Sequence, residues 1–185
     1  MPSILITGGA RSGKSGFAYE LALKLGEPVL FVATATAGDE EMVQRIEQHQ
    51  RARPAAWSTL EATTHIGRQI LRKIGQARVV IVDCITLLVS NIFGQYAQQG
   101  EQIDASLVEK EVTAEINELI DCINRVDARF IIVTNEVGTG LVPPSKVARL
   151  YRDLLGKANQ MLAEVSDEVY LMVAGLPVRV KPAGS

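Results

Sequence analysis

A glycine-rich segment near the start of the chain has the composition of a phosphate-binding loop. The segment GGARSGKS, residues 8–15, fits the pattern G-x-x-x-x-G-K-[ST]. Its glycines allow the backbone to wrap a phosphate chain, and the positive end of the helix that follows adds attraction. We expect Lys14 to reach the β- and γ-phosphates of a nucleoside triphosphate and the Ser15 hydroxyl to bind Mg²⁺. A chance glycine turn is the alternative, which the predicted strand before the segment and the predicted helix after it disfavour.

A carboxylate is expected at the same site. The run VVIVD, Val79–Asp83, is typical of a buried strand, and its terminal carboxylate would hold Mg²⁺ through the metal's water shell. A strand-end aspartate that only caps a turn is the alternative.

Two classes of nucleotide hydrolase are disfavoured. Cys84 stands where motor-type ATPases often place a glutamate to orient water. The guanine-recognition motif N-K-x-D of switch GTPases is missing, because TNEV at residues 134–137 has neither the lysine nor the aspartate. Transfer of a nucleotide group to an acceptor is therefore the favoured chemistry.

The segment RIEQHQRARP, residues 45–54, contains His49, one of two histidines in the chain. It belongs to a helix predicted to begin near Asp39, where acidic residues complement the helix dipole. Met42, Ile46 and His49 follow the spacing i, i+4, i+7, which places the histidine on the apolar face. This spacing favours a core histidine.

The chemistry of imidazole favours a different role for His49. Near its usual pKa of about 6.5 the ring is mostly neutral at pH 7, and a nitrogen lone pair is available for attack. Attack at an α-phosphate would give a phosphoramidate, while Arg51 and Arg53 neutralise the departing pyrophosphate. A solvated helix end is the alternative for the two arginines. His65, which has no comparable cluster nearby, is predicted to be structural.

Strand-like and helix-like runs alternate along the chain. The strands are predicted at residues 4–7, 29–35, 79–83 and 130–137, with a final edge hairpin at 168–174 and 178–181. Helices are predicted at residues 63–74, 106–126 and 145–165. This order predicts an α/β fold with a mostly parallel sheet and helices on both faces. The glutamine-rich stretch 90–104 breaks the alternation and is predicted to be a loop or a partner surface.

Composition sets the broad class of the protein. A chain of 185 residues predicts a single domain over residues 1–185. The net charge of −2 gives no bulk electrostatic reason for a nucleic-acid or membrane partner. No apolar run approaches the roughly 18 residues of a membrane span, and the early loop glycines leave no room for a signal peptide, so a cytoplasmic protein is expected. Cys84 and Cys122 lie among apolar residues and are predicted to be buried free thiols.

Taken together, these segments closely resemble the bifunctional adenosylcobinamide kinase / adenosylcobinamide-phosphate guanylyltransferase family of cobalamin biosynthesis. The similarity runs through GGARSGKS, DEEM..RI..H...RP..W.T.E, VDCIT, VTNEVGTGLVP and R.YRDLLG..NQ.LA, and it covers nearly the whole chain. This ordered set is far more specific than the phosphate loop, which many families share.

The resemblance implies a RecA-like P-loop core, a homotrimer and two reactions. ATP or GTP phosphorylates the aminopropanol hydroxyl of adenosylcobinamide. GTP then transfers GMP to an enzyme histidine and releases pyrophosphate, after which the corrinoid phosphate takes the GMP to give adenosylcobinamide-GDP. His49 matches the family's guanylylated histidine, because it lies after RI and before RP..W.

The resemblance also implies the nucleotide contacts. They fall on Gly8, Gly9, Ala10, Arg11, Ser12, Gly13, Lys14, Ser15, Thr34, Ala35, Thr36, Gln50, Arg51, Ala52, Arg53, Glu61 and Asp83, with Ser15 and Asp83 as the Mg²⁺ ligands. Glu61 would accept hydrogen bonds from guanine N–H groups, or it is an exposed loop acid. Two other functions remain as alternatives: a P-loop kinase of another small hydroxyl substrate without a covalent step, and a non-enzymatic nucleotide-binding module.

Overall fold

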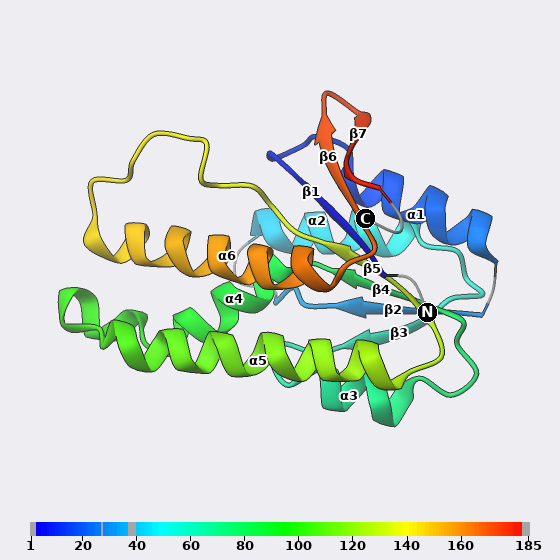
Figure 1. Ribbon diagram of the computed structural model, residues 1–185, viewed down its shortest axis with the longest axis horizontal. Coiled ribbons are helices and arrows are strands. Elements are labelled where there is room, and N and C mark those ends of the chain that lie inside the picture. Colours follow the sequence, from blue (N-terminus) through cyan, green and yellow to red (C-terminus); the bar gives the residue numbers. More distant parts are fainter. Residues whose placement is uncertain (1–2, 27, 37–39, 183–185) are drawn as a thin grey trace.

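A computed structural model describes residues 3–26, 28–36 and 40–182 of the chain, with the backbone alone at positions 41, 42, 45, 49, 97 and 101. A seven-stranded sheet runs through the molecule in the order β3-β2-β4-β5-β1-β6-β7 (Figure 1). The strands are β1 Ser3–Gly8, β2 Val29–Ala33, β3 Ser58–Glu61, β4 Val79–Asp83, β5 Arg129–Val133, β6 Glu168–Val173 and β7 Leu176–Lys181. All pairings are parallel except that of β6 with β7. The predicted parallel sheet and edge hairpin are thus confirmed.

Helices cover both faces of this sheet, as predicted. The helices are α1 Lys14–Leu25, α2 Glu40–Ala52, α3 Ile66–Lys73, α4 Ile85–Gly94, α5 Ala105–Arg125 and α6 Lys146–Val165, with a 3₁₀ helix, η1, at Ala97–Gln102. Alternate residues of each central strand enter two separate cores. One core includes Ile81 and residues of α1, and the other includes Val80 and residues of α3, α4, α5 and α6. The strands are apolar on both faces because each face is covered.

Two strands end earlier than predicted. The strand expected at 29–35 ends at Ala33, and the one expected at 130–137 ends at Val133. The next residue in each case is a fully buried threonine, whose N–H still donates to the neighbouring strand and whose side chain bonds to a residue outside the strands. Thr34 Oγ1 donates to the Cys84 carbonyl at 2.7 Å, and Thr134 Oγ1 donates to Asn159 Oδ1 at 2.7 Å.

The prediction of a loop at residues 90–104 is wrong over most of that range. Residues 90–94 complete α4, residues 97–102 form η1, and Ile92, Phe93 and Ile103 are buried. Ile92 and Phe93 continue an apolar stripe that begins at Ile85, with the spacing i, i+3, i+4, i+7, i+8. The helix predicted at 63–74 begins only at Ile66.

Both cysteines are free and buried, as predicted. Burial, and to a smaller extent the charge of Glu118, raises the pKa of Cys122 to about 11. None of the helices in the described part of the chain combines the length and hydrophobicity that a membrane span requires.

Candidate nucleotide-binding site

The strand order brings the chemistry-bearing segments to one edge of the sheet. β1, β5 and β4 are adjacent and parallel, so the residues that follow them meet at their carboxyl ends. A cavity of about 790 Å³ lies there, lined by Ala10, Arg11, Ser12, Gly13, Lys14, Ser15, Gly16, Gln44, Gln48, Asp83, Cys84, Val133 and Asn135. The fold therefore places the predicted phosphate loop and the predicted carboxylate in one cavity.

The loop has a conformation that glycine permits. Gly8 and Gly13 have φ of 150° and 93°, values that L side chains rarely adopt. A Cβ on Gly8 would lie 2.7 Å from the Met172 carbonyl oxygen, and one on Gly13 would lie 3.2 Å from the Gly175 Cα. Lys14 is buried, and its Nζ donates to the Gly9 carbonyl at 2.6 Å. The loop thus wraps around the lysine head group.

The C-terminal hairpin supports the phosphate loop from behind. The Gly175 N–H, in the turn between β6 and β7, donates to the Ser12 carbonyl at 3.1 Å. Met172 is buried against Gly8. The loop shape therefore depends on residues near the end of the chain.

Ser15 and Asp83 fit a magnesium ion that is shared with a nucleotide. Both residues line the cavity. Within the described residues, no three His, Cys, Asp or Glu side chains gather in a way that could hold a metal. A cation here would take its remaining ligands from phosphate oxygens and water, which is the usual mode for Mg²⁺ at phosphate-transfer sites.

Helix α2 borders the cavity through Gln44 and Gln48. His49 is the next residue of the same helix, and its side chain, like that of Met42, lies outside the described residues. The prediction that Met42, Ile46 and His49 share an apolar face therefore stays a prediction, with Ile46 half-buried.

The four residues after His49 are not among those that line the cavity. Gln50 and Ala52 are exposed, and Arg51 is 80% exposed and pairs with Glu47 at 3.2 Å. Arg53 instead holds the end of α2 against the sheet. Its guanidinium lies 3.7 Å from the Phe31 ring centroid, and its Nη1 donates to Thr59 Oγ1 at 2.9 Å.

The remaining predicted contacts lie beside the cavity at the ends of β2 and β3. Thr34 is fully buried, and its hydroxyl also accepts from the Cys84 N–H at 2.8 Å, so this side chain joins the ends of β2 and β4. Ala35 is half-buried and Thr36 exposed. Glu61, the last residue of β3, is exposed and pairs in register with Ala33. The Thr34 N–H donates to the Asp83 carbonyl and its carbonyl accepts from Asn91 Nδ2 at 2.9 Å, so Thr34 holds the strand ends together, and of residues 34–36 only Ala35 and Thr36 are open to a ligand.

Sequence reasoning missed Asn135, Gln44 and Gln48, which also line the cavity. The two glutamines have the i, i+4 spacing of one helix face, which was a usable signal. Asn135 lies just beyond the carboxyl end of β5, after the buried Thr134. Strand β5 is adjacent to β1, which leads into the phosphate loop. This adjacency of β5 and β1 follows from the strand order and cannot be read from the local sequence.

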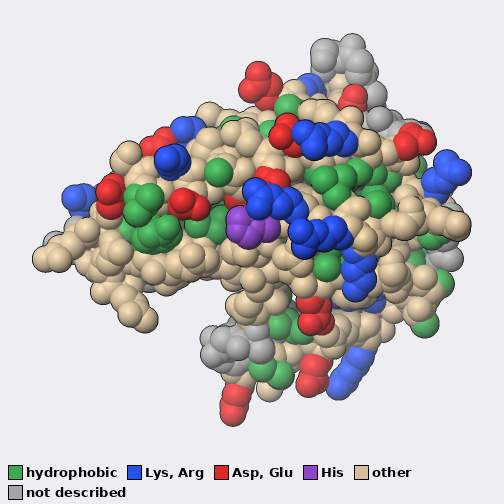
Figure 2. Space-filling model, turned by 90° about the horizontal axis from the view of Figure 1, so that it is seen from below, with side chains coloured by type: hydrophobic (Ala, Val, Ile, Leu, Met, Phe, Trp, Pro, Cys, Tyr) green, Lys and Arg blue, Asp and Glu red, His purple; other side chains and the backbone are tan. Residues whose placement is uncertain are grey.

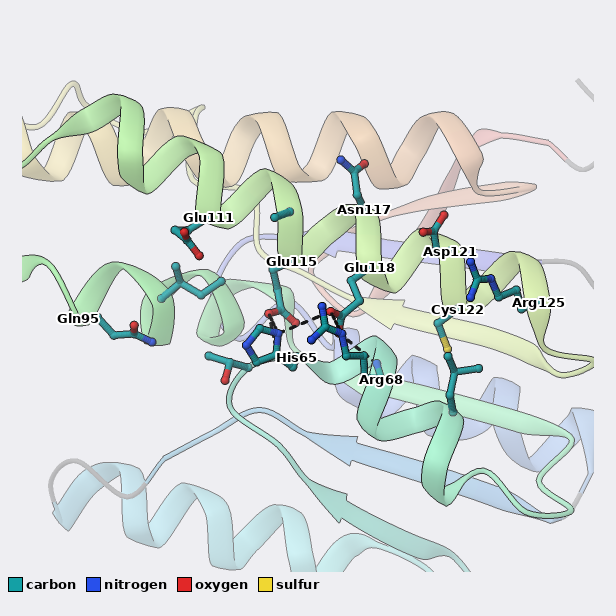
Figure 3. Close-up of a pocket in the computed structure, with 14 residues that line it drawn as sticks. His65, Arg68, Gln95, Glu111, Glu115, Asn117, Glu118, Asp121, Cys122 and Arg125 are labelled. Atoms are coloured by element: carbon teal, nitrogen blue, oxygen red, sulfur yellow. Dashed lines mark hydrogen bonds and ion pairs between the residues drawn. The ribbon is translucent and has the colours of Figure 1, made fainter.

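A second cavity, of about 410 Å³, lies along α3 and α5 (Figure 3). Here Glu115, 5% exposed, accepts from the backbone N–H groups of His65 at 2.7 Å and Ile66 at 2.8 Å. The neighbouring Glu118 pairs with Arg68 at 2.7 Å. His65 thus lies at the fixed start of α3, in agreement with its predicted structural role.

The surface charge agrees with the weak net charge of the chain. On the face shown in Figure 2, acidic and basic side chains are interspersed.

Comparisons with known proteins agree with this site. The sequence model described as "Cobinamide kinase / cobinamide phosphate guanyltransferase" matches residues 4–180. The chain is 41% identical to the "Bifunctional adenosylcobalamin biosynthesis protein CobU" of Escherichia coli (strain K12), over 96% of this chain and 99% of that protein. It is 38% identical to the "Bifunctional adenosylcobalamin biosynthesis protein CobP" of Pseudomonas aeruginosa, over 96% of each chain.

The fold is also found in solved structures. A prototypical ATPase from the type III secretion system of pathogenic bacteria superposes with a TM-score of 0.55 at 9% identity, over 96% of this chain and 56% of that chain. This likeness concerns the fold alone, which is the predicted RecA-like P-loop fold. Because the family model matches residues 4–180 and the relatives match over 96% of the chain, the chain belongs to the cobinamide kinase / cobinamide phosphate guanyltransferase family of adenosylcobalamin biosynthesis, whose named members are bifunctional enzymes.

Proposed function

We propose that the enzyme phosphorylates adenosylcobinamide with a nucleoside triphosphate and then transfers GMP from GTP, through a guanylyl-histidine at His49, to the corrinoid phosphate. The observation that carries this proposal is the composition of the main cavity. The phosphate loop, Asp83 and the helix that carries His49 all border it.

In the first reaction, the loop N–H groups and Lys14 hold the β- and γ-phosphates. Ser15 and Asp83 would hold Mg²⁺, which would neutralise negative charge on the phosphate oxygens. The aminopropanol oxygen forms a bond to the γ-phosphorus, and the bond from that phosphorus to the bridging oxygen breaks. The diphosphate keeps the electron pair and the hydroxyl proton passes to solvent. Burial raises the pKa of the nearby Tyr19, so its neutral phenol is not the base.

In the second reaction, a neutral imidazole nitrogen of His49 attacks the α-phosphorus of GTP, and the bond to the bridging oxygen breaks to release pyrophosphate. An oxygen of the corrinoid phosphate then attacks the same phosphorus, and the nitrogen–phosphorus bond breaks. His49 directly follows Gln48, which lines the cavity, and this adjacency supports the proposal that His49 reaches a nucleotide bound there.

The two arginines after His49 receive different roles. We assign Arg51 to the departing pyrophosphate, because its exposed ion pair with Glu47 is weak enough to exchange for phosphate. Arg53 is proposed to support the site from the end of α2, where its guanidinium lies over the Phe31 ring and its Nη1 donates to Thr59 Oγ1. Glu61 is proposed to accept from guanine N–H groups.

The test is intact-protein mass spectrometry after incubation with Mg²⁺ and GTP labelled at the α-phosphate. We expect a GMP-sized, labelled adduct on the parent enzyme and none on His49→Asn. The matched control is His65→Asn, which removes the other histidine and is expected to label fully. Equal labelling of His49→Asn and the parent would refute the covalent role. Acceptor-dependent ADP formation with no adduct would favour a kinase of another hydroxyl substrate.

We also propose that the enzyme is a homo-oligomer, a trimer according to the family resemblance. Apolar side chains on the edge hairpin support self-association. Val173, Leu176, Val178 and Val180 are between 49% and 69% exposed, and together they form an apolar patch of the kind that marks protein interfaces. Sedimentation equilibrium measures the mass directly, and a monomer at micromolar concentration would contradict this proposal.

A further inference from the structure

A polar residue without an assigned role, Asn135, lines the nucleotide cavity. Strand β5 separates β1, which leads into the phosphate loop, from β4, which ends at Asp83. Asn135 follows β5 and lines the same cavity as Lys14 and Asp83. It therefore stands between the group expected at the γ-phosphate and the group expected at the metal.

The backbone of Asn135 is fixed on both sides by side chains from two helices. Its N–H donates to Thr86 Oγ1 of α4 at 2.8 Å, and its carbonyl accepts from Asn159 Nδ2 of α6 at 3.0 Å. Asn159 Oδ1 accepts from the buried Thr134 at 2.7 Å, so one amide holds two successive residues.

A further bond fixes the helix side of this arrangement. Tyr151 donates its hydroxyl to the Thr86 carbonyl at 3.0 Å. Burial, with a smaller effect from Cys84, raises the pKa of Tyr151 to about 12, so the phenol remains a donor throughout the neutral range. Groups from α4 and α6 thus hold the residue rigidly, which is the condition for a preorganised catalytic group.

The side-chain amide of Asn135 differs from its backbone in this respect. Within the described part of the chain it makes no hydrogen bond, although the backbone polar groups of the same residue both do. The residue is half-buried in the cavity wall. The backbone of Asn135 is held rigidly beside a phosphate site, while its side-chain amide has no hydrogen-bond partner among the described residues. This combination indicates that the amide binds substrate.

We infer that Asn135 is a catalytic residue of the phosphoryl-transfer step, in which its Nδ2 donates to an oxygen of the transferred γ-phosphoryl group. This inference rests on the proposed kinase reaction. The amide neither gains nor loses a proton, and the bonds that form and break are those given above. Its contribution is to hold the γ-phosphoryl group in line with the attacking hydroxyl and to stabilise charge on its oxygens.

The two reactions of the enzyme distinguish this role from a purely structural one. In phosphoryl transfer the γ-phosphorus is the reacting centre, so the loss of a contact to its oxygens lowers kcat. In guanylyl transfer the α-phosphorus reacts and the γ-phosphate leaves intact within pyrophosphate. There the same loss affects the KM for GTP, and kcat changes little.

The experiment compares both activities of Asn135→Ala with those of the parent enzyme. We expect the kinase kcat with adenosylcobinamide to fall about 100-fold, as for the loss of one preorganised donor, and the kcat of guanylyl transfer to stay within about threefold. Asn124→Ala on the exposed face of α5 is the matched control and is expected to resemble the parent.

A second variant tests the positioning role of Asn159. Asn159→Asp keeps the oxygen that accepts from Thr134 and removes the donor to the Asn135 carbonyl. We expect the kinase kcat to fall about fivefold, the equivalent of one ordinary hydrogen bond, with the KM for nucleotide unchanged.

The outcomes separate this inference from the proposed function. If the parent enzyme does not phosphorylate adenosylcobinamide, the proposed function fails. If the parent is active and Asn135→Ala keeps its kinase kcat within threefold, or loses both activities equally, the assignment of Asn135 is wrong.

Discussion

Glu115 is expected to determine where α3 begins, and its replacement by glutamine gives a sharp test of this structure. The residue at the helix N-cap, His65, has a left-handed backbone with φ of 51° and makes no side-chain cap. The carboxylate of Glu115, on a different helix, takes the place of that cap by accepting from two backbone N–H groups. A negative charge at this position also complements the helix dipole.

The expected loss can be worked from these two bonds. A hydrogen bond to a charged group contributes about 1.5–3 kcal/mol, and a buried donor left unpaired costs a similar amount. Glu115→Gln keeps one carbonyl oxygen and turns an NH₂ group toward the second N–H. We therefore expect the free energy of unfolding to fall by about 2–3 kcal/mol. Glu115→Ala removes both acceptors and leaves a cavity, so its loss is larger, at about 3–5 kcal/mol.

The assay is urea denaturation at pH 7, followed by circular dichroism. The matched control is Glu111→Gln, one helical turn earlier on α5, where the side chain is exposed. That variant is expected to stay within about 0.5 kcal/mol of the parent. If Glu115→Gln unfolds at the same urea concentration as Glu111→Gln, the carboxylate does not cap α3.

Two further predictions concern the phosphate loop and the core. Gly13→Ala places a Cβ 3.2 Å from Gly175 in a left-handed backbone, so calorimetry should show GTP binding about tenfold weaker, with a loss of about 1–2 kcal/mol in unfolding free energy. Gly156→Ala, where a Cβ meets open space on α6, should raise the free energy of unfolding by up to about 1 kcal/mol. Unimpaired GTP binding by Gly13→Ala would contradict this account of the loop. Because the folded state raises the pKa of Cys122 from 9.0 to about 11, its thiol contributes stability below pH 9 that is lost as the pH rises toward 11. Between pH 8 and pH 10.5 the free energy of unfolding of the parent should fall by about 2 kcal/mol more than that of Cys122→Ala. If the free energies of unfolding of the two proteins change in parallel over this pH range, the prediction is wrong.

Local patterns were sufficient to predict the central strands and the long helices. The run Val79–Asp83 is apolar throughout and ends in an acid, and the helix predicted at 106–126 differs from α5 by one residue at each end. The loop at residues 8–15 lies between β1 and α1, as its motif requires. Each of these signals lies within a few consecutive residues.

Features that depend on distant partners could not be predicted. Strand β3 has only four residues, two of them exposed, and it forms because β2 offers a parallel partner. The guanidinium of Arg53 lies over the Phe31 ring of β2, a contact between residues 22 positions apart. The capping of α3 by Glu115 joins residues 50 positions apart. None of these pairings leaves a local trace in the sequence.

The hydrogen bond from Gly175 to Ser12 has a consequence for how the enzyme is made. Translation delivers Ser12 of the phosphate loop long before Gly175, in the turn that supports it. A growing polypeptide on the ribosome therefore has a phosphate loop without this support until the hairpin of β6 and β7 has been made. A premature stop codon just before that hairpin would spare the phosphate loop and Asp83 and still leave the loop without its backing.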